Sequence, residues 1–179
     1  MKRTSLLILS LFFSCQMFKK KNDDFSILLG LSLFLNQPPT CSPVIEDPLF
    51  LNQWHIQNTG QLGGITGEDG KVVGIWQEGN WGYGTKIAIV DDGMDTHHQD
   101  LKENVWFPLN YNYVTSTTDL STHYFYAQHG TSVAGVASGR CNDIGIRGIA
   151  PLANLIGYNV LLANSNSLNA DAMIRNKND

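Results

Sequence analysis

The most informative stretch of this 179-residue chain is Lys86-Ile87-Ala88-Ile89-Val90-Asp91-Asp92-Gly93. Its apolar, β-branched residues do not alternate with polar ones, which is typical of a strand buried on both faces in a parallel sheet. Two carboxylates and a glycine follow, so the chain is expected to turn at the carboxyl edge of that sheet. Open α/β sheets place their functional sites at this edge, and Asp91 is therefore the first candidate site residue.

Helices and strands are predicted to alternate around this stretch. A strand over Leu109–Val114 leads into a polar loop over Thr115–Gln128. A helix then runs from His129 to Gly139, with Val133, Val136 and Ala137 lining one face and small Ala134 and Gly135 permitting close packing. The remaining elements are a helix over Val72–Gly79 that buries Ile75 and Trp76, a strand over Leu155–Leu161, and a last helix from Leu168 that Ser167 caps. This alternation predicts an α/β fold with a mostly parallel sheet.

The first 45 residues have the composition of an export signal and a linker. Residues 1–16 combine a basic start with a short apolar core, and Ser14-Cys15 resembles a bacterial lipoprotein cleavage box with Cys15 as the lipid attachment site. Residues 17–45 contain a second apolar run, for which Met17 is an alternative start, and a proline-rich linker. The folded part is expected over residues 46–179, and the protein is expected in the cell envelope, where a lipid would anchor it to the membrane, or outside the cell.

The charge of the chain is unevenly distributed. Five of the twelve Lys and Arg lie in residues 1–21, and from Asn22 onward seven basic side chains accompany all sixteen acidic ones. This balance argues against a nucleic-acid partner, which needs a basic surface, and it suits calcium or cationic substrates.

Three cysteines are present, at positions 15, 41 and 141. Because Cys15 lies in the signal, only one disulfide, between Cys41 and Cys141, could form in the mature chain. A free Cys141, packed as a small apolar side chain, is the favoured prediction.

Asp91 and His129 can work together chemically. A carboxylate at a sheet edge can hold a histidine in one tautomer and stabilise its imidazolium. At a helix N-terminus the positive end of the helix dipole is expected to favour the neutral ring, which is the form that accepts a proton. Gly130 lets the backbone bend beside the ring, and Thr131 is expected to cap the first turn. Each residue alone has a structural alternative, a turn cap for Asp91 and an exposed helix start for His129.

The two motifs together, Asp91-Asp92-Gly93 at a strand end and His129-Gly130-Thr131 at the start of a small-residue helix, resemble the subtilisin-like serine proteases. Further segments resemble the kexin-like members and their bacterial relatives: Asp47–His55, Asn58–Gln61, Val72–Trp76 and Gly148–Pro151. The resemblance covers about Asp47 to Leu168, close to the first half of a catalytic domain. It implies a three-layer, doubly wound α/β fold, incomplete in this chain, and an endopeptidase of polypeptides with Asp91 and His129 as catalytic residues.

The resemblance also implies a calcium site and a substrate-binding residue. Calcium takes six to eight oxygen ligands, and extended backbone offers carbonyls at every second residue. The implied ligands are the carbonyls of Arg140, Ile144 and Ile146 and the side chains of Asn142, Asp100 and Asp47. Asp92 corresponds to a residue that helps to receive a basic substrate side chain, although Tyr126-Ala127-Gln128 lacks the acids that strict dibasic specificity would suggest.

A complete triad also needs a serine and an oxyanion-hole donor. The family's Gly-Thr-Ser-x-Ala-x-Pro motif and its Asn donor are not found in these 179 residues, and Ser132 only imitates the motif from the histidine helix. The chain is therefore expected to be a truncated gene product or fragment that is inactive alone and, because a parallel sheet cut midway exposes an edge, prone to aggregate.

Two other functions fit the same residues. One is a non-catalytic exported protein that keeps the calcium site and uses the fold for binding. A weaker one is a metal hydrolase using His97, His98 and Asp100. This function is disfavoured because neighbouring side chains on extended backbone, here the two histidines, point to opposite faces and cannot easily bind one ion.

Overall fold

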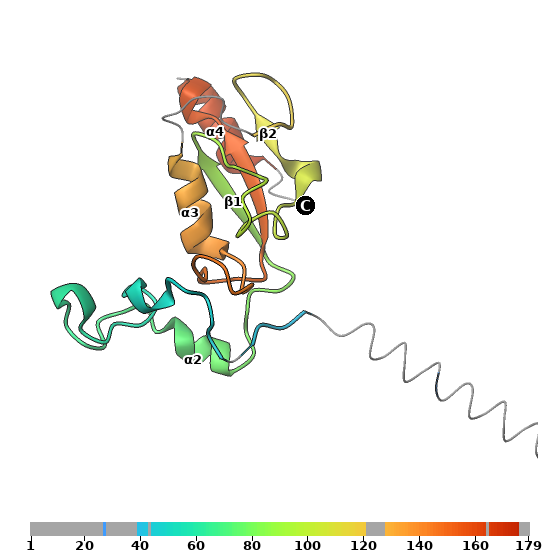
Figure 1. Ribbon diagram of the computed structural model, residues 1–179. Coiled ribbons are helices and arrows are strands. Elements are labelled where there is room, and N and C mark those ends of the chain that lie inside the picture. Colours follow the sequence, from blue (N-terminus) through green and yellow to red (C-terminus); the bar gives the residue numbers. More distant parts are fainter. Residues whose placement is uncertain (1–26, 28–38, 43, 121–127, 164, 176–179) are drawn as a thin grey trace, which may run out of the picture. The chain divides into compact units, whose positions relative to one another are not determined.

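The computed structural model describes residues 27, 39–42, 44–120, 128–163 and 165–175 (Figure 1). The chain divides into two compact units, Met1–Pro38 and Pro39–Asp179. The predicted signal, its lipid attachment site at Cys15 and most of the second apolar run lie outside the described residues. Among the residues that are described, no helix has both the length and the apolar character needed to cross a membrane. Only the second unit is described below.

The centre of the second unit is a parallel sheet of three described strands. They are β1 (Lys86–Asp91), β2 (Tyr111–Asn112) and β3 (Asn154–Asn159), in the order β1-β3-β2. β1 pairs with β3 so that Asp91 lies opposite Asn159. The predicted strands are confirmed in position, but β2 is shorter than the expected Leu109–Val114. The first half of β1 is also less buried than expected, because β1 lies at the edge of this described sheet.

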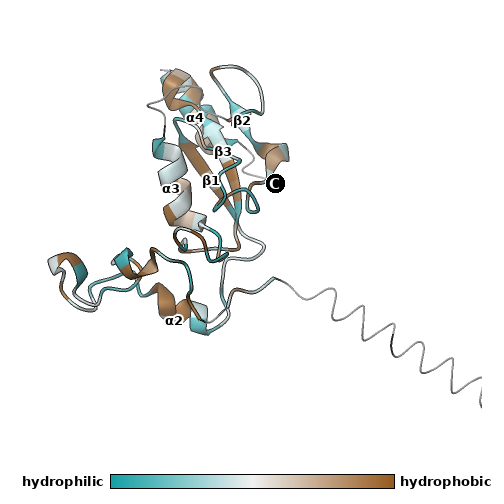
Figure 2. Ribbon diagram, viewed as in Figure 1, coloured by the Kyte–Doolittle hydropathy of each residue, from teal (hydrophilic) through white to brown (hydrophobic). Residues whose placement is uncertain are grey.

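Helices cover both faces of the sheet (Figure 1). On one face, Ala134 of α3 (His129–Ser138) belongs to an apolar cluster with Ile89 and Leu155. On the other face, Ala172 of α4 (Asn166–Ile174) packs with Ile156 and Tyr158. Side chains alternate along each strand, so both faces carry apolar residues, and Figure 2 shows β1 in the colours of an apolar element. The predicted α/β architecture, with helices in two layers around a parallel sheet, is confirmed.

The close packing expected of Ala134 and Gly135 in α3 is confirmed, whereas the two valines of the apolar face lie at the surface. Val133 and Val136 are 36% and 41% exposed, whereas Gly130, Ala134, Gly135 and Ser138 are buried. The helix turns its small residues inward because they let its backbone approach the sheet edge and neighbouring loops, and this close approach excludes the larger valines. Figure 2 accordingly shows α3 mostly pale.

A second apolar cluster lies around α2 (Val72–Gln77), where Trp76 and Trp81 stack with 5.6 Å between ring centroids. Trp76 is buried as expected, but Ile75 is 51% exposed, because the short helix buries Val72 and Trp76 instead. α4 also begins earlier than expected: its N-cap is Ser165, not Ser167.

The prediction of a free Cys141 is wrong, because Cys41 and Cys141 form a disulfide. Cys41 is 6% exposed and belongs to the cluster around α2. Residues 39–42, 44 and 45 belong to the same compact unit as the sheet, Pro39–Asp179. In the loop-entropy account, closing a loop of 100 residues stabilises a fold by about 5 kcal/mol.

Candidate active site

Asp91 lies at the carboxyl end of β1, on the sheet face that α3 covers. Its side chain follows Ile87 and Ile89 along that face, and the residue is 6% exposed. Its backbone carbonyl accepts the N–H of Val160 at 2.9 Å, so the strand is paired up to its last residue. The carboxylate is thus carried by a rigid element and not by the loop that follows.

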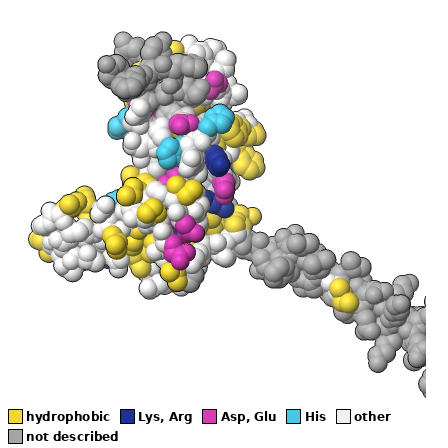
Figure 3. Space-filling view, viewed as in Figure 1, with side chains coloured by type: hydrophobic (Ala, Val, Ile, Leu, Met, Phe, Trp, Pro, Cys, Tyr) yellow, Lys and Arg dark blue, Asp and Glu magenta, His cyan; other side chains and the backbone are white. Residues whose placement is uncertain are grey.

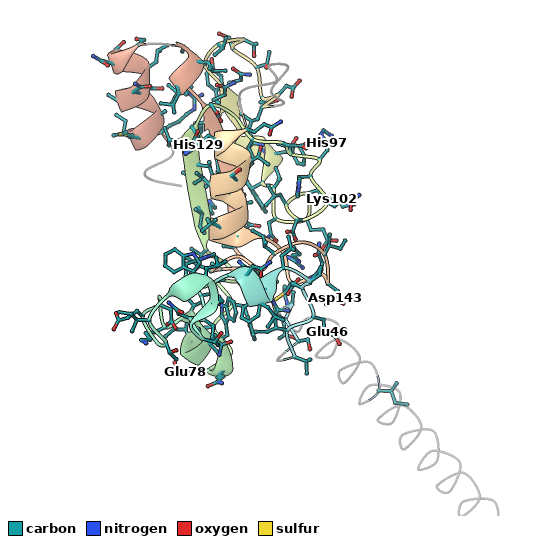
Figure 4. All side chains as sticks on the ribbon, turned by 60° about the vertical axis from the view of Figure 1, so that its left-hand side comes forward. Glu46, Glu78, His97, Lys102, His129 and Asp143 are labelled. Carbon is teal, nitrogen blue, oxygen red and sulfur yellow. A yellow bond between two sulfur atoms is a disulfide. The ribbon has the colours of Figure 1, made fainter. Side chains whose placement is uncertain are left out.

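His129, labelled in Figure 4, is the first residue of α3. Its Nδ1 lies 2.9 Å from each carboxylate oxygen of Asp91. This contact places the proton on Nδ1, which donates to the carboxylate, and leaves Nε2 free to accept one. The imidazole is 72% exposed while the carboxylate is 9% exposed, so a reacting group can approach the ring from solvent. The structure therefore brings together the two residues that the sequence singled out.

Asp92 caps the N-terminus of α3. Its Oδ2 accepts the N–H of His129 at 3.2 Å and its Oδ1 accepts the N–H of Gly130 at 2.8 Å. Both are first-turn N–H groups that have no partner within the helix. Thr131 does not cap this turn as expected, because its Oγ1 accepts the N–H of Asp95 at 2.9 Å. Asp92, 9% exposed, therefore fixes the position from which His129 projects.

The pKa of His129 is raised above its ordinary value of 6.5. The main cause is the hydrogen bond to Asp91, followed by the charge of Asp91, with a smaller contribution from Asp92. The expected lowering by the helix dipole is thus wrong in its net direction. Asp92 neutralises the positive helix end, and the Asp91 carboxylate favours the protonated ring.

We expect an NMR titration of the Cε1 protons to separate His129 from His55. His129 should titrate above pH 6.5, whereas burial lowers the pKa of His55 below that value. Because the folded-state pKa of His129 is raised, its contribution to stability is fully present below pH 6.5 and is lost as the pH rises through the folded pKa. An Asp91→Asn variant should bring the His129 midpoint back toward 6.5 and leave His55 unchanged. A midpoint of His129 at or below 6.5 in the unaltered chain would contradict this geometry.

Ser132 does not lie in a nucleophile's position. Its hydroxyl donates to the carbonyl of Gln128 at 3.2 Å, four residues back along α3, and the residue is exposed. Among the bonds of the described residues, none links it to His129.

The loop after α3 places the expected calcium ligands near Asp100. Asp100 is 2% exposed; its Oδ2 accepts the N–H of Ile146 at 3.1 Å, and its buried Oδ1 has no hydrogen-bond partner among the residues that the structure describes. Burial raises the pKa of this carboxyl group, opposed by the Ile146 hydrogen bond. A cation beside Oδ1 would satisfy both the oxygen and the charge, so these residues fit a bound calcium ion.

The other expected ligands contribute in different ways. Asn142 lies beside the backbone that precedes Asp100, because its amide nitrogen donates to the carbonyl of Gln99 at 3.2 Å. Its Oδ1 accepts the N–H of Ile144, and the Arg140 carbonyl accepts the N–H of Asn142. Across the described ranges, no three His, Cys, Asp or Glu side chains are grouped so that they could hold a metal ion. A calcium ion here would therefore depend on carbonyl and amide oxygens.

Asp47, the remaining expected ligand, forms a buried ion pair with Arg147. Its Oδ2 accepts the Nε–H of Arg147 at 2.6 Å, and its Oδ1 accepts the N–H of Asp143 at 3.2 Å. Sequence reasoning missed Arg147, since a single cation in Ile146-Arg147-Gly148 carries no local signal that it is buried. Its burial, at 0% exposure, is visible only in the folded chain.

His97 and His98 lie in an exposed turn (Figure 4 labels His97). Nδ1 of His97 lies 3.3 Å from Oγ1 of Thr96, and Nδ1 of His98 accepts the N–H of Asp100 at 3.2 Å. One ring nitrogen of His98 is therefore already used by a backbone N–H. Figure 3 shows histidine, acidic and basic side chains on one face of the part of the chain that the structure describes.

On this fold, a buried carboxylate at the sheet edge holds a histidine at the start of a helix. This is the geometry of the Asp–His pair in serine proteases. The chain belongs to the subtilase family, whose sequence model matches residues 82–178. The extracellular serine protease of Aeromonas sobria is 37% identical over 147 residues, which cover 79% of this chain and 23% of that protein. A dibasic-processing endoprotease of Schizosaccharomyces pombe is 34% identical over 66% of this chain and 16% of its own length.

Solved structures agree with this assignment. The crystal structure of the Aeromonas sobria serine protease superimposes with a TM-score of 0.64 and 34% identity, over 77% of this chain and 23% of that one. The same protease in complex with its chaperone gives a TM-score of 0.62. The subtilisin-like fold is thereby confirmed, and the chain spans about a quarter or less of the length of the relatives named here.

Proposed function

We propose that this chain supplies the catalytic carboxylate and the general base of peptide-bond hydrolysis in an exported subtilisin-like serine endopeptidase. Asp91 orients His129 and stabilises its imidazolium, and Nε2 of His129 takes the proton from a serine hydroxyl and passes it to the leaving amine. The observation that carries the proposal is the 2.9 Å contact of Nδ1 with both oxygens of a buried carboxylate. Export is supported by the name of the Aeromonas sobria relative, an extracellular protease.

Asp92 and the Asp100 loop are proposed to serve this reaction indirectly. Each oxygen of Asp92 accepts one backbone N–H, but among the described residues no Lys or Arg forms an ion pair with it, so its charge can still attract a basic substrate side chain. A calcium ion held by Asp100, Asn142 and the carbonyls of Arg140, Ile144 and Ile146 would supply charge that fixes this loop against the fold.

The isolated 179 residues are proposed to be inactive, because among the described residues no hydrogen bond joins a hydroxyl group to His129, and Ser132 bonds to Gln128. The second candidate function, a non-catalytic exported protein that binds calcium, rests on the unpartnered Oδ1 of Asp100. It predicts calcium binding without any contribution of Asp91 and His129 to hydrolysis.

A chimaera tests the proposal. Residues 39–179 would replace the aligned segment of the Aeromonas sobria protease, which retains its own downstream sequence. We expect the chimaera to hydrolyse a chromogenic peptide and His129→Ala to lower kcat by about 10⁶-fold, the size of the loss that removal of the triad histidine causes in subtilisin. Ser132→Ala, three residues further along the same helix, should change kcat less than twofold. A folded chimaera without activity, or one that tolerates His129→Ala, would leave only the non-catalytic candidate.

A further inference from the structure

Arg147 is a buried cation beside the proposed calcium loop. Its Nε lies 2.6 Å from Oδ2 of Asp47, and the two side chains are 1% and 0% exposed. A second guanidinium nitrogen donates to the carbonyl of Ser42 at 3.2 Å, and the group lies 5.8 Å from the centroid of the Trp76 ring. Buried charges need a partner of opposite sign, and Asp47 is the partner that Arg147 contacts.

The main chain of Arg147 is held by the same N-terminal segment. The Gln53 amide donates to the Arg147 carbonyl at 2.8 Å, and its oxygen accepts the Arg147 N–H at 2.9 Å. Nearby, the N–H of Leu49 donates to the carbonyl of Gly145 at 2.9 Å. With the disulfide between residues 41 and 141, these contacts attach residues 41–53 to residues 140–147 through protein groups alone.

The two carboxylates in this region therefore differ in what they still offer a metal ion. Both oxygens of Asp47 are engaged, one by Arg147 and the other by the Asp143 N–H. Asp100 uses only Oδ2, and its Oδ1 is buried without a partner. One carboxylate, Asp100, is therefore available to a calcium ion, whereas the ligand set expected from the sequence contains two, Asp47 and Asp100.

We propose that Arg147 removes Asp47 from the calcium ligand set, so that Asp100 is the single carboxylate that binds the ion, and that its guanidinium takes the place of a metal in holding residues 41–53. The proposal rests on the calcium site of the proposed function. Calcium affinity rises with the number of charged ligands, so this arrangement weakens the site while keeping the N-terminal segment attached when calcium is scarce.

Arg147→Met tests the proposal in the full chain by calorimetric titration with CaCl₂. Freeing Asp47 and removing a nearby positive charge should tighten calcium binding by about tenfold or more, because both changes favour the ion. In EDTA the variant should melt at lower temperature than the unaltered chain, since Asp47 is left unpaired, and saturating calcium should restore most of the difference.

Lys102→Met is the matched control: it removes an exposed cation two residues from Asp100 (Figure 4), and its calcium affinity should stay within about threefold of the unaltered chain because solvent screens that charge. Unchanged or weaker calcium binding by Arg147→Met would overturn the proposal.

A double variant keeps the test valid if Arg147→Met does not fold. Asp47→Asn/Arg147→Met removes both buried charges and should bind calcium as the unaltered chain does, whereas a tenfold loss would show that Asp47 is a ligand after all. If the unaltered chain binds no calcium, the calcium part of the proposed function fails separately. Melting in EDTA then decides the role of Arg147: the double variant should melt above the temperature that the two single variants predict by addition, and strict additivity would refute the pairing.

Discussion

Replacing Asp91 by Asn in the chimaera should lower kcat by about 10⁴-fold while leaving KM nearly unchanged. Asn has the size of Asp, so β1 and the cap on α3 should remain intact. An amide, however, can donate to Nδ1 of His129 and thereby place the proton on Nε2, the atom that must accept one. The amide also carries no charge to stabilise the imidazolium that forms during the reaction.

Two measurements distinguish this effect from a loss of structure. The raised pKa of His129 should fall toward 6.5, because its main cause, the hydrogen bond to Asp91, is weakened. Asp95→Asn is the matched control, since Asp95 is an exposed carboxylate four residues further on whose Oδ1 accepts the N–H of His97. A loss below tenfold for Asp91→Asn would show that Asp91 does not orient the base.

The parts of the site that could be predicted from sequence are those whose signals are local. An unalternating apolar run ends at Asp91, and a polar loop gives way to small residues at His129. Each element therefore forms where its own residues favour it, and the α/β order brings the strand end and the helix start to one edge of the sheet.

The parts that could not be predicted depend on contacts between distant residues. Cys41 with Cys141, and Asp47 with Arg147, are each separated by 100 positions. The sequence left Cys41 as the one possible partner of Cys141 but did not show that the two bond, and no pattern near Asp47 or Arg147 identifies that pair. The exposure of Val133 and Val136 on α3 has a related reason: which residues face inward depends on how closely the helix backbone approaches its neighbours, and there the small residues, expected to permit close packing, are the buried ones.

Gly130→Ala should destabilise the fold and separate the Asp–His pair at once. A Cβ at this position would lie 2.0 Å from the carbonyl oxygen of Gly93 and 2.9 Å from Cβ of Asp91, so the start of α3 must move away from the sheet edge. Both neighbours are held close to the backbone and cannot rotate aside as a flexible side chain could. The loss in free energy of unfolding should be about 3 kcal/mol or more, at the upper end of overpacking effects.

The same displacement should also slow the catalysed reaction, because a shift of about 1 Å in a catalytic group can lower the rate by about 100-fold. In the chimaera, Gly130→Ala should therefore lower kcat by at least that factor and bring the pKa of His129 toward 6.5, as the contact with Asp91 lengthens. Gly74→Ala is the control: Gly74 is exposed inside α2 with no atom within 4 Å of the added Cβ, so alanine should stabilise the helix by roughly 0.5–1 kcal/mol. Thermal melting, kcat and the His129 titration would be measured on both variants. If Gly130→Ala melts and reacts like Gly74→Ala, the close approach between α3 and the end of β1 is not what positions the base.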